Sequence, residues 1–179
     1  ANRARGVLVS TPGRVLVENN RFESSGSAIL IGGDANQWYE SGAVRDVTIR
    51  GNVFGAACLG SPYQFSEGII SIFPEIPRPD PESSFHRNIR IEANEFHASD
   101  YPVLYARSVD GLEFSGNHLV RGRLFEPAHP RKATLTFEGC RRVRVDRNRL
   151  DADVLGKNIL LKDTPAAEVM VGSNQAWIR

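Results

Sequence analysis

A repeated octet constrains the fold of this chain more than any other feature of its sequence. The pattern apolar-x-apolar-x-x-Asn-x-apolar occurs six times, at residues 15–22, 47–54, 89–96, 112–119, 143–150 and 169–176. The spacings from one repeated asparagine to the next are 32, 42, 23, 31 and 26 residues. A recurring unit of about 20 to 50 residues is typical of a solenoid, in which each unit stacks on the one before it.

A second short apolar run precedes each octet. These runs are residues 6–10, 28–32, 69–73, 102–106, 133–137 and 158–162. Short period-two runs separated by Gly, Asn, Asp and Pro predict strands, and no stretch shows a sustained helical period with caps. Leucine-rich repeats would need a steadier period, and propeller blades would need four strands each. The sequence therefore predicts an all-β fold: a right-handed, single-stranded parallel β-helix of about six coils.

The six repeated asparagines are expected to stack at one corner of the coil. They are Asn20, Asn52, Asn94, Asn117, Asn148 and Asn174. An asparagine tolerates the left-handed backbone conformation of a tight corner, and its amide can bond the amides of the coils above and below. We interpret this ladder as structural and do not predict a functional site there.

Residues between the buried apolar positions are expected to face outward. In the octet strands these are mostly polar, namely Leu16, Thr48, Arg90, Glu113, Arg144 and Met170. In the other strands four of them are leucines, namely Leu8, Leu30, Leu104 and Leu160. An apolar face of this kind predicts a cover, either another domain of the chain or a second subunit in a homodimer. Both ends of the stack lack a cap, so residues 1–179 are expected to be a β-helix segment with further coils upstream.

Charge and cysteine usage argue against several classes of partner. The 22 basic and 21 acidic residues give a net charge of +1, too little to gather nucleic acid or an anionic membrane. No apolar run approaches the roughly 20 residues that cross a bilayer. Cys58 and Cys140 lack metal-ligand spacing, and three coils would hold them about 14 Å apart, too far for a disulfide. We therefore expect no nucleic acid, membrane, metal or cofactor.

Two long insertions interrupt the repeat after equivalent strands of neighbouring coils, at residues 33–45 and 74–87. Aligning the strands before them without a gap places Asp34 and Glu75 at the same position of successive coils. Adjacent strands lie about 4.8 Å apart, and diverging side chains can widen the carboxyl separation to the roughly 5 to 9.5 Å used by glycoside hydrolases. The two acids therefore predict a glycosidase centre.

Other residues near the insertions complete the candidate site. Trp38 and Tyr39 offer flat faces on which a sugar ring can stack, and Glu40 follows them as a further contact. Glu40 and Glu67 are rival carboxylates, although Glu67 precedes its strand and is expected to point elsewhere. Arg107 follows the equivalent strand of coil four, so it could reach the same cleft and bind a sugar hydroxyl or steady a carboxylate. Structural roles stay open, because an aspartate at a strand end is usually a turn former and an exposed arginine is common.

Most of the chain matches one known pattern. The matching stretches are Arg5-Gly-Val-Leu-Val-Ser-Thr-Pro-Gly-Arg-Val-Leu-Val-Glu-Asn-Asn20, Ala28-Ile-Leu-Ile31 with Asp34, Trp38-Tyr-Glu-Ser-Gly42, Val47-Thr-Ile-Arg-Gly-Asn-Val-Phe54, Ile70-Ser-Ile72 with Pro74-Glu75, and Tyr101-Pro-Val-Leu-Tyr105. In these stretches the chain resembles glycoside hydrolase family 110, most specifically in its first half.

The resemblance implies a bacterial, secreted or periplasmic exo-α-galactosidase. Such an enzyme removes terminal α-1,3-linked galactose with inversion, needs no metal, and carries barrel-like domains on its β-helix. The resemblance implies Asp34 and Glu75 as the catalytic carboxylates and Trp38 as a sugar contact. The family sometimes has an acidic pair where this chain has Gly33-Asp34. Which carboxylate is the acid and which the base therefore stays open.

Two other functions fit the same architecture. A polysaccharide lyase would need acidic clusters that bind calcium near an arginine or lysine base, whereas acids are sparse in the insertions. A non-catalytic glycan-binding or structural β-helix would have even coils. The unequal spacings of 42 and 23 residues favour a site.

Overall fold

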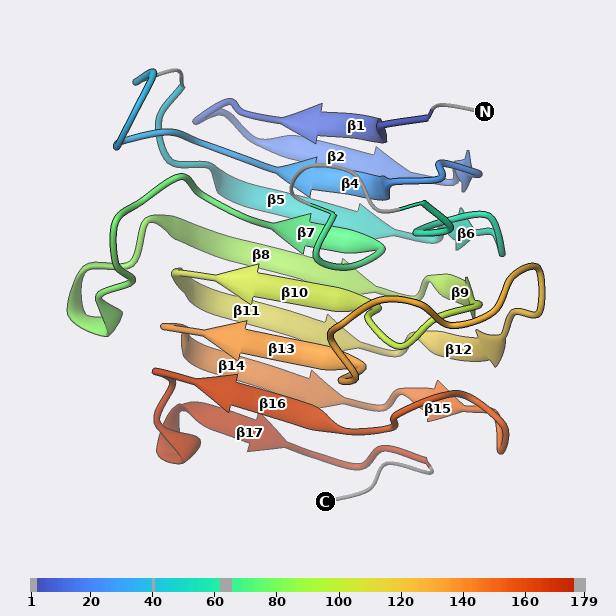
Figure 1. Cartoon of the computed structure of the whole chain (residues 1–179). Helices are drawn as coiled ribbons and strands as arrows, with labels where there is room; N and C mark the ends of the chain where they lie inside the picture. The colour runs from blue at the N-terminus through green and yellow to red at the C-terminus, as the bar shows by residue number, and fades with distance from the viewer. Residues whose placement is uncertain (1–2, 40, 62–65, 176–179) are drawn as a thin grey trace.

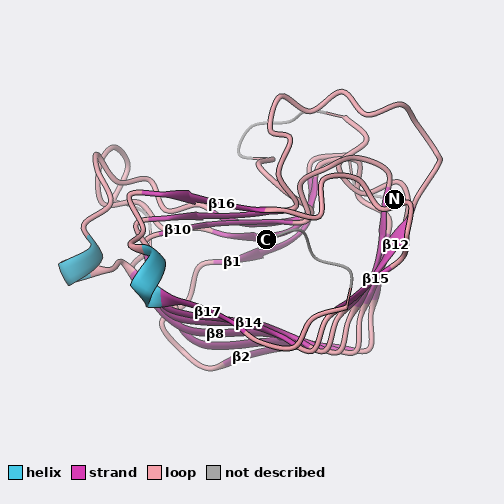
Figure 2. Ribbon diagram, turned by 90° about the horizontal axis from the view of Figure 1, so that it is seen from below, coloured by secondary structure: helices cyan, strands magenta, loops and turns pink. Residues whose placement is uncertain are grey.

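The computed structural model describes residues 3–39, 41–61 and 66–175. The chain winds into a stack of coils whose sides are three parallel sheets (Figures 1 and 2). As the chain descends in Figure 1, the front strands run to the left and the strands behind them run to the right. This course is right-handed, and it confirms the predicted parallel β-helix.

Each sheet takes one strand from successive coils. The first sheet contains β1 (Arg5–Val9), β4 (Ser27–Ile31), β7 (Ile70–Ile72), β10 (Leu104–Arg107), β13 (Leu135–Glu138) and β16 (Ile159–Lys162). The second contains β2 (Val15–Glu18), β5 (Arg45–Arg50), β8 (His86–Glu92), β11 (Val109–Ser115), β14 (Arg141–Asp146) and β17 (Val169–Val171). The third contains β3 (Arg21–Phe22), β6 (Val53–Phe54), β9 (Glu95–Ala98), β12 (His118–Arg121) and β15 (Arg149–Leu150).

The third sheet was not predicted as strands. Its five strands begin just after the first five repeated asparagines, at the end of the octet, where only two residues remain in the pattern. Two short 3₁₀ turns complete the fold, η1 (Pro81–Ser83) in the second insertion and η2 (Ala166–Glu168) before β17. No helix in the described ranges is long and apolar enough to cross a membrane.

The core runs through the centre of the stack, because alternate side chains of every strand point inward. Phe22, Phe54 and Phe96 of the third sheet stack face to face, with ring centroids 5.1 and 4.5 Å apart. Full burial of a side chain of this size contributes about 1.5 to 3 kcal/mol. Cys58 and Cys140 are buried in the same core and both are free thiols, as expected from their separation.

The asparagine ladder forms as predicted. From Asn20 to Asn174, each side-chain amide donates to the side-chain oxygen of the next coil's asparagine, at 2.8 to 3.1 Å. The prediction that the asparagines themselves take the left-handed conformation is wrong. The residue before each of the first five does so, namely Asn19, Gly51, Ala93, Gly116 and Arg147. The ladder asparagine instead uses its side chain to bond both its neighbours and the backbone.

The outward residues of the second sheet are in the predicted register, with Leu16 beside Thr48 and Glu113 beside Arg90 and Arg144. The predicted four-leucine face of the first sheet is wrong. Leu104 pairs with Ile70 and Leu135 and is fully buried in the core, so Tyr105 is the outward residue of that coil.

Only the ends of that outward column are exposed. Leu8 and Leu160 are 49% and 46% exposed, whereas Leu30 is buried. Near the centre, the guanidinium of Arg131 lies 4.6 Å from the centroid of the Tyr105 ring. The segment that carries Arg131, residues 122–134, crosses in front of the first sheet (Figure 1, in orange). The chain therefore covers part of this face with its own segment.

That covering segment is pinned by a buried carboxylate. Asp100 is 5% exposed and accepts hydrogen bonds from the backbone amides of Ala128, at 2.7 Å, and His129, at 2.8 Å. The ring of His129 contacts the Ser66 carbonyl at 3.0 Å. The segment is therefore a fixed part of the fold.

Candidate active site

Both long insertions leave the first sheet at the same edge, after β4 and β7. Asp34 and Glu75 pair there in an isolated parallel bridge beyond the last regular residues of the strands. The Glu75 amide donates to the Gly33 carbonyl at 2.7 Å, and the Ala35 amide donates to the Glu75 carbonyl at 3.0 Å. The predicted register of these two acids is confirmed, so their backbones are neighbours across adjacent coils.

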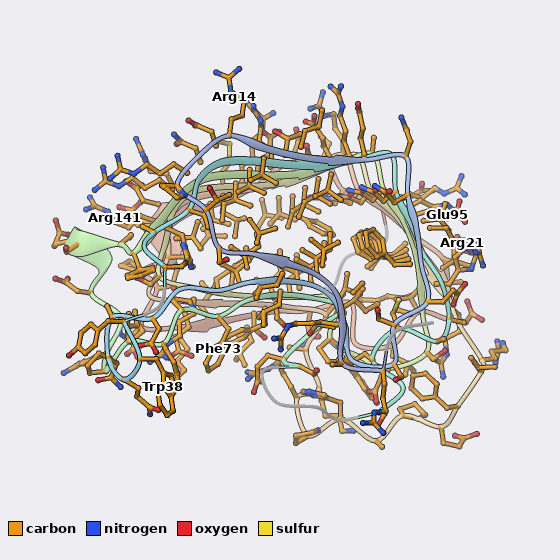
Figure 3. The ribbon with its side chains drawn as sticks, turned by 90° about the horizontal axis from the view of Figure 1, so that it is seen from above. Arg14, Arg21, Trp38, Phe73, Glu95 and Arg141 are labelled. Atoms are coloured by element: carbon orange, nitrogen blue, oxygen red, sulfur yellow. The ribbon has the colours of Figure 1, made fainter. Side chains whose placement is uncertain are left out.

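A pocket of about 450 Å³ opens on the outer face of the first sheet beside this bridge. Its volume lies within the range of small-molecule sites, about 300 to 1,000 Å³. Both acidic residues line it, together with two aromatic residues, Trp38 and Phe73. The remaining lining residues are Arg5, Leu8, Ser10, Leu30, Gly32, Gly33, Gln37 and Ser41. In Figure 3, Trp38 and Phe73 both lie outside the coil, on the side of the first sheet.

The Asp34 carboxylate is held by three backbone amides. Oδ1 accepts from Asn36 and Gln37, both at 2.8 Å, and Oδ2 accepts from Trp38 at 2.7 Å. The Gln37 bond, with help from those of Asn36 and Trp38, outweighs desolvation and lowers the pKa of Asp34 below its ordinary value. Asp34 is therefore a carboxylate at neutral pH. Oδ2, with one donor for its two lone pairs, can still accept a bond.

Glu75 has a different environment. Its side chain is half-buried in the pocket wall, and no residue in the described ranges donates a hydrogen bond to its carboxylate. The two acids thus share one pocket but differ in how they are held. One is fixed by the backbone and charged, and the other is free to bond a ligand.

The predicted aromatic contacts separate in the structure. Trp38 lines the pocket and is 76% exposed, whereas Tyr39 is 75% exposed and is not among the lining residues. Tyr39 and Ser41 have φ angles of 54° and 58°, in the left-handed region that non-glycine residues rarely adopt. Glu40, the predicted further contact, lies outside the described residues.

The structure does not bring Arg107 into this pocket. Its guanidinium lies 5.6 Å from the centroid of the Phe73 ring, on the coil-four side of that ring. Its Nε is 3.4 Å from Oε1 of Glu138. Arg107 is thus not among the residues that line this pocket, and its guanidinium packs against the Phe73 ring of the pocket wall.

A buried polar cluster behind that wall was not predicted. The Tyr105 hydroxyl donates to Oε2 of Glu138 at 2.7 Å, and Nζ of Lys162 lies 3.1 Å from Oε1. Burial opposes ionisation of Glu138, but the bonds from Tyr105 and Lys162 outweigh it and lower its pKa. Burial, reinforced by Glu138, raises the pKa of Tyr105. The cluster could have been predicted from the residues of the first sheet that face outward. The assignment of Leu104 to the outward face in place of Tyr105 hid it.

Phe73 was also missed, although its position was readable. It lies two residues before Glu75 and therefore points to the same face of the strand. Gly33 has a structural reason to lack a side chain. An added Cβ would lie 2.6 Å from Cε1 of Phe85 and 3.1 Å from the Gly42 carbonyl oxygen. An acidic residue at position 33 would not fit beside Phe85.

Within the part of the chain that the structure describes, no three His, Cys, Asp or Glu side chains gather closely enough to hold a metal ion. The acidic cluster that a calcium-dependent lyase would need is therefore missing from these residues.

Comparison with known proteins gives a consistent set of relatives. No family model matches the chain. It is 55% identical over 172 residues to alpha-1,3-galactosidase B of Bacteroides thetaiotaomicron, which covers 96% of this chain and 28% of that protein. It is 42% identical over 175 residues to alpha-1,3-galactosidase B of Akkermansia muciniphila, covering 96% of this chain and 22% of that protein. It is 39% identical over 170 residues to the protein of the same name from Parabacteroides distasonis, covering 94% of this chain and 28% of that protein. The chain spans about a quarter of the length of these relatives.

Proposed function

Since the chain belongs to glycoside hydrolase family 110, we propose that it forms the catalytic β-helix of an enzyme that hydrolyses terminal α-1,3-linked galactose. The observation that supports this most directly is the bridge between Asp34 and Glu75, which brings two carboxylates into one pocket of ligand size. The names of the relatives supply the substrate class.

Asp34 is proposed as the general base. Its backbone hydrogen bonds favour the charged form, and one lone pair of Oδ2 is left to accept a proton from water. Glu75 is proposed as the general acid, because a second carboxyl group without fixed donors can carry a proton to the glycosidic oxygen. Trp38 and Phe73 are proposed as the faces against which the sugar ring packs.

The proposed reaction has one displacement. Glu75 gives its proton to the leaving oxygen as the bond from that oxygen to the anomeric carbon breaks. Asp34 takes a proton from the water that forms the new bond on the opposite face, so the α-galactoside yields β-galactose. Inversion requires about 6.5 to 9.5 Å between the carboxyl groups, and side chains that diverge from strands about 4.8 Å apart can reach this separation.

The test uses the parent protein that contains this chain, incubated with an α-1,3-galactosyl disaccharide and followed by proton NMR. We expect β-galactose to appear before its α anomer. Asp34→Asn and Glu75→Gln should each lower kcat by about a thousandfold or more, since each removes a proton-transfer group. A variant that keeps more than a tenth of wild-type turnover would exclude its residue from the proposed role, and α-galactose as first product would exclude inversion.

A further inference from the structure

Asp34 does more in this structure than present a carboxylate to the pocket. It closes the base of the first insertion twice, because its amide donates to the Ser41 carbonyl at 3.4 Å and its side chain accepts from three amides. Those amides belong to Asn36, Gln37 and Trp38, so the carboxylate orders the whole turn that leads to the tryptophan. Hydrogen bonds of amides to a charged carboxylate are among the stronger ones in proteins.

The indole of Trp38 has little else to orient it. It is 76% exposed, and the hydrogen bonds and ring contacts found among the described residues do not include it. Its direction is therefore set by its backbone. That backbone continues into Tyr39 and Ser41, whose left-handed φ angles persist only where neighbouring contacts hold them. Asp34 supplies contacts on both sides of it, because its carboxylate accepts from the amides of residues 36–38 and its own amide donates to the Ser41 carbonyl.

We propose that Asp34 is the positioning residue for Trp38: its carboxylate fixes the aromatic face on which the terminal galactose packs, so substrate affinity depends on Asp34 through Trp38. This inference rests on the proposed function of the pocket as a galactoside site. It separates the two acids, because no hydrogen bond among the described residues joins the Glu75 carboxylate to either insertion, and Glu75 can be neutralised without disturbing the turn.

Substitution by asparagine tests this role sharply. In Asp34→Asn the remaining side-chain oxygen could still accept from Asn36 and Gln37, but the new amide nitrogen would face the Trp38 amide, donor against donor. Asp80 offers a matched control, because its carboxylate accepts from the Glu82 amide at 2.9 Å in the second insertion and is not among the pocket lining residues.

The experiment measures binding of the α-1,3-galactosyl disaccharide to the parent protein by calorimetry, in variants too slow to consume it. Glu75→Gln, whose turn is undisturbed, supplies the reference dissociation constant. We expect Asp34→Asn to bind at least tenfold more weakly, and Glu75→Gln with Asp80→Asn to match Glu75→Gln. Trp38→Ala, made in the Glu75→Gln background, should lower the affinity for the disaccharide by about the same factor as Asp34→Asn does. Combining Trp38→Ala with Asp34→Asn should weaken binding no further, because both act through one contact.

Equal affinity of Asp34→Asn and Glu75→Gln would overturn the inference. So would a combined Asp34→Asn and Trp38→Ala variant whose loss of binding free energy is the sum of the two separate losses. If Asp34→Asn does not fold, Asp34→Thr replaces it, since a hydroxyl can still accept from one amide. A readout without ligand keeps this inference separate from the proposed function. With fluorotryptophan labelling, the Trp38 resonance, assigned by its absence in Trp38→Phe, should shift in Asp34→Asn and stay in place in Glu75→Gln. An unshifted resonance in Asp34→Asn overturns the inference even where the enzyme proves active.

Discussion

At the scale of single residues, the candidate site is organised by small differences between equivalent positions. Asp34 and Glu75 are bridge partners on adjacent coils, yet the backbone of the first insertion turns back onto the Asp34 carboxylate, whereas no described residue donates to the Glu75 carboxylate. Their pairing was predictable, because the strands before them align without a gap. The fixation of Asp34 was not, because it depends on the path of five loop residues that carry no periodic pattern.

Gly33 shows how closely this edge is packed. We expect Gly33→Ala to lower the free energy of unfolding by about 1 to 3 kcal/mol, because the new methyl group would overlap the Phe85 ring. Phe85→Leu should remove most of that penalty when the two changes are combined. Chemical denaturation of both single variants and the double variant measures the coupling. Simple addition of the two single effects would contradict the steric explanation.

His86 predicts a dependence of stability on pH. It is fully buried, its Nδ1 accepts from the Val44 amide at 3.1 Å, and burial lowers its pKa to about 3. In the unfolded chain the pKa is about 6.5, so between these values the unfolded state binds the extra proton and stability falls as the pH is lowered. From pH 7 to pH 5 this loss should be about 2 kcal/mol.

The measurement compares denaturation at pH 7 and pH 5 in wild type and in His86→Leu. The variant should be less stable at both pH values, because the Val44 amide loses its acceptor. Its free energy of unfolding should also change less between pH 7 and pH 5 than that of the wild type. A variant that keeps the full wild-type slope would show that another group is responsible.

At the scale of elements, the asparagine corner and the alternating strands determine the register of the whole stack. Sequence alone located this register because every octet carries its own asparagine marker. It failed at Leu104, where Val103, Leu104, Tyr105 and Ala106 form an unbroken apolar run and no polar residue marks the outward face. It also missed the segment over Tyr105, whose path is set by Asp100 from the preceding coil.

The ladder asparagines should contribute unequally to the free energy of unfolding, depending on their place in the stack. Asn94 is 2% exposed; its oxygen accepts from Asn52, and its amide donates to the Ile49 carbonyl and to Asn117. Asn94→Ala should therefore cost about 2 to 4 kcal/mol, since several buried groups lose their partners. Asn20→Ala, at the exposed end, should cost less than about 1 kcal/mol. Equal losses at the two positions, measured by denaturation, would contradict a contribution that depends on burial.

At the scale of the whole molecule, the outer face of the first sheet is divided between two uses. Its first three coils carry the pocket, and residues 122–134 cover the part of the face around Tyr105, whereas Leu160 of the last coil stays exposed (Figure 1). The coil architecture could be derived from the repeat because each unit obeys the same pattern. The division of the outer face between the pocket and the covering segment could not be derived in this way, because the two long insertions and the covering segment are the parts that do not repeat.

The asparagine ladder also gives the stack a polarity. From Asn20 to Asn148, each side-chain amide donates one hydrogen bond to the asparagine oxygen of the next coil, so this chain of side-chain bonds runs in one direction along the stack. Coil one presents the Asn20 oxygen at its end of the column, and coil six turns the Asn174 amide to backbone carbonyls. Any coil or neighbouring solenoid that continued this column beyond Asn20 would have to meet that oxygen with a donor. Coils can therefore be added to the asparagine column in one orientation only. Two stacks joined through their Asn20 ends would place one acceptor oxygen against another.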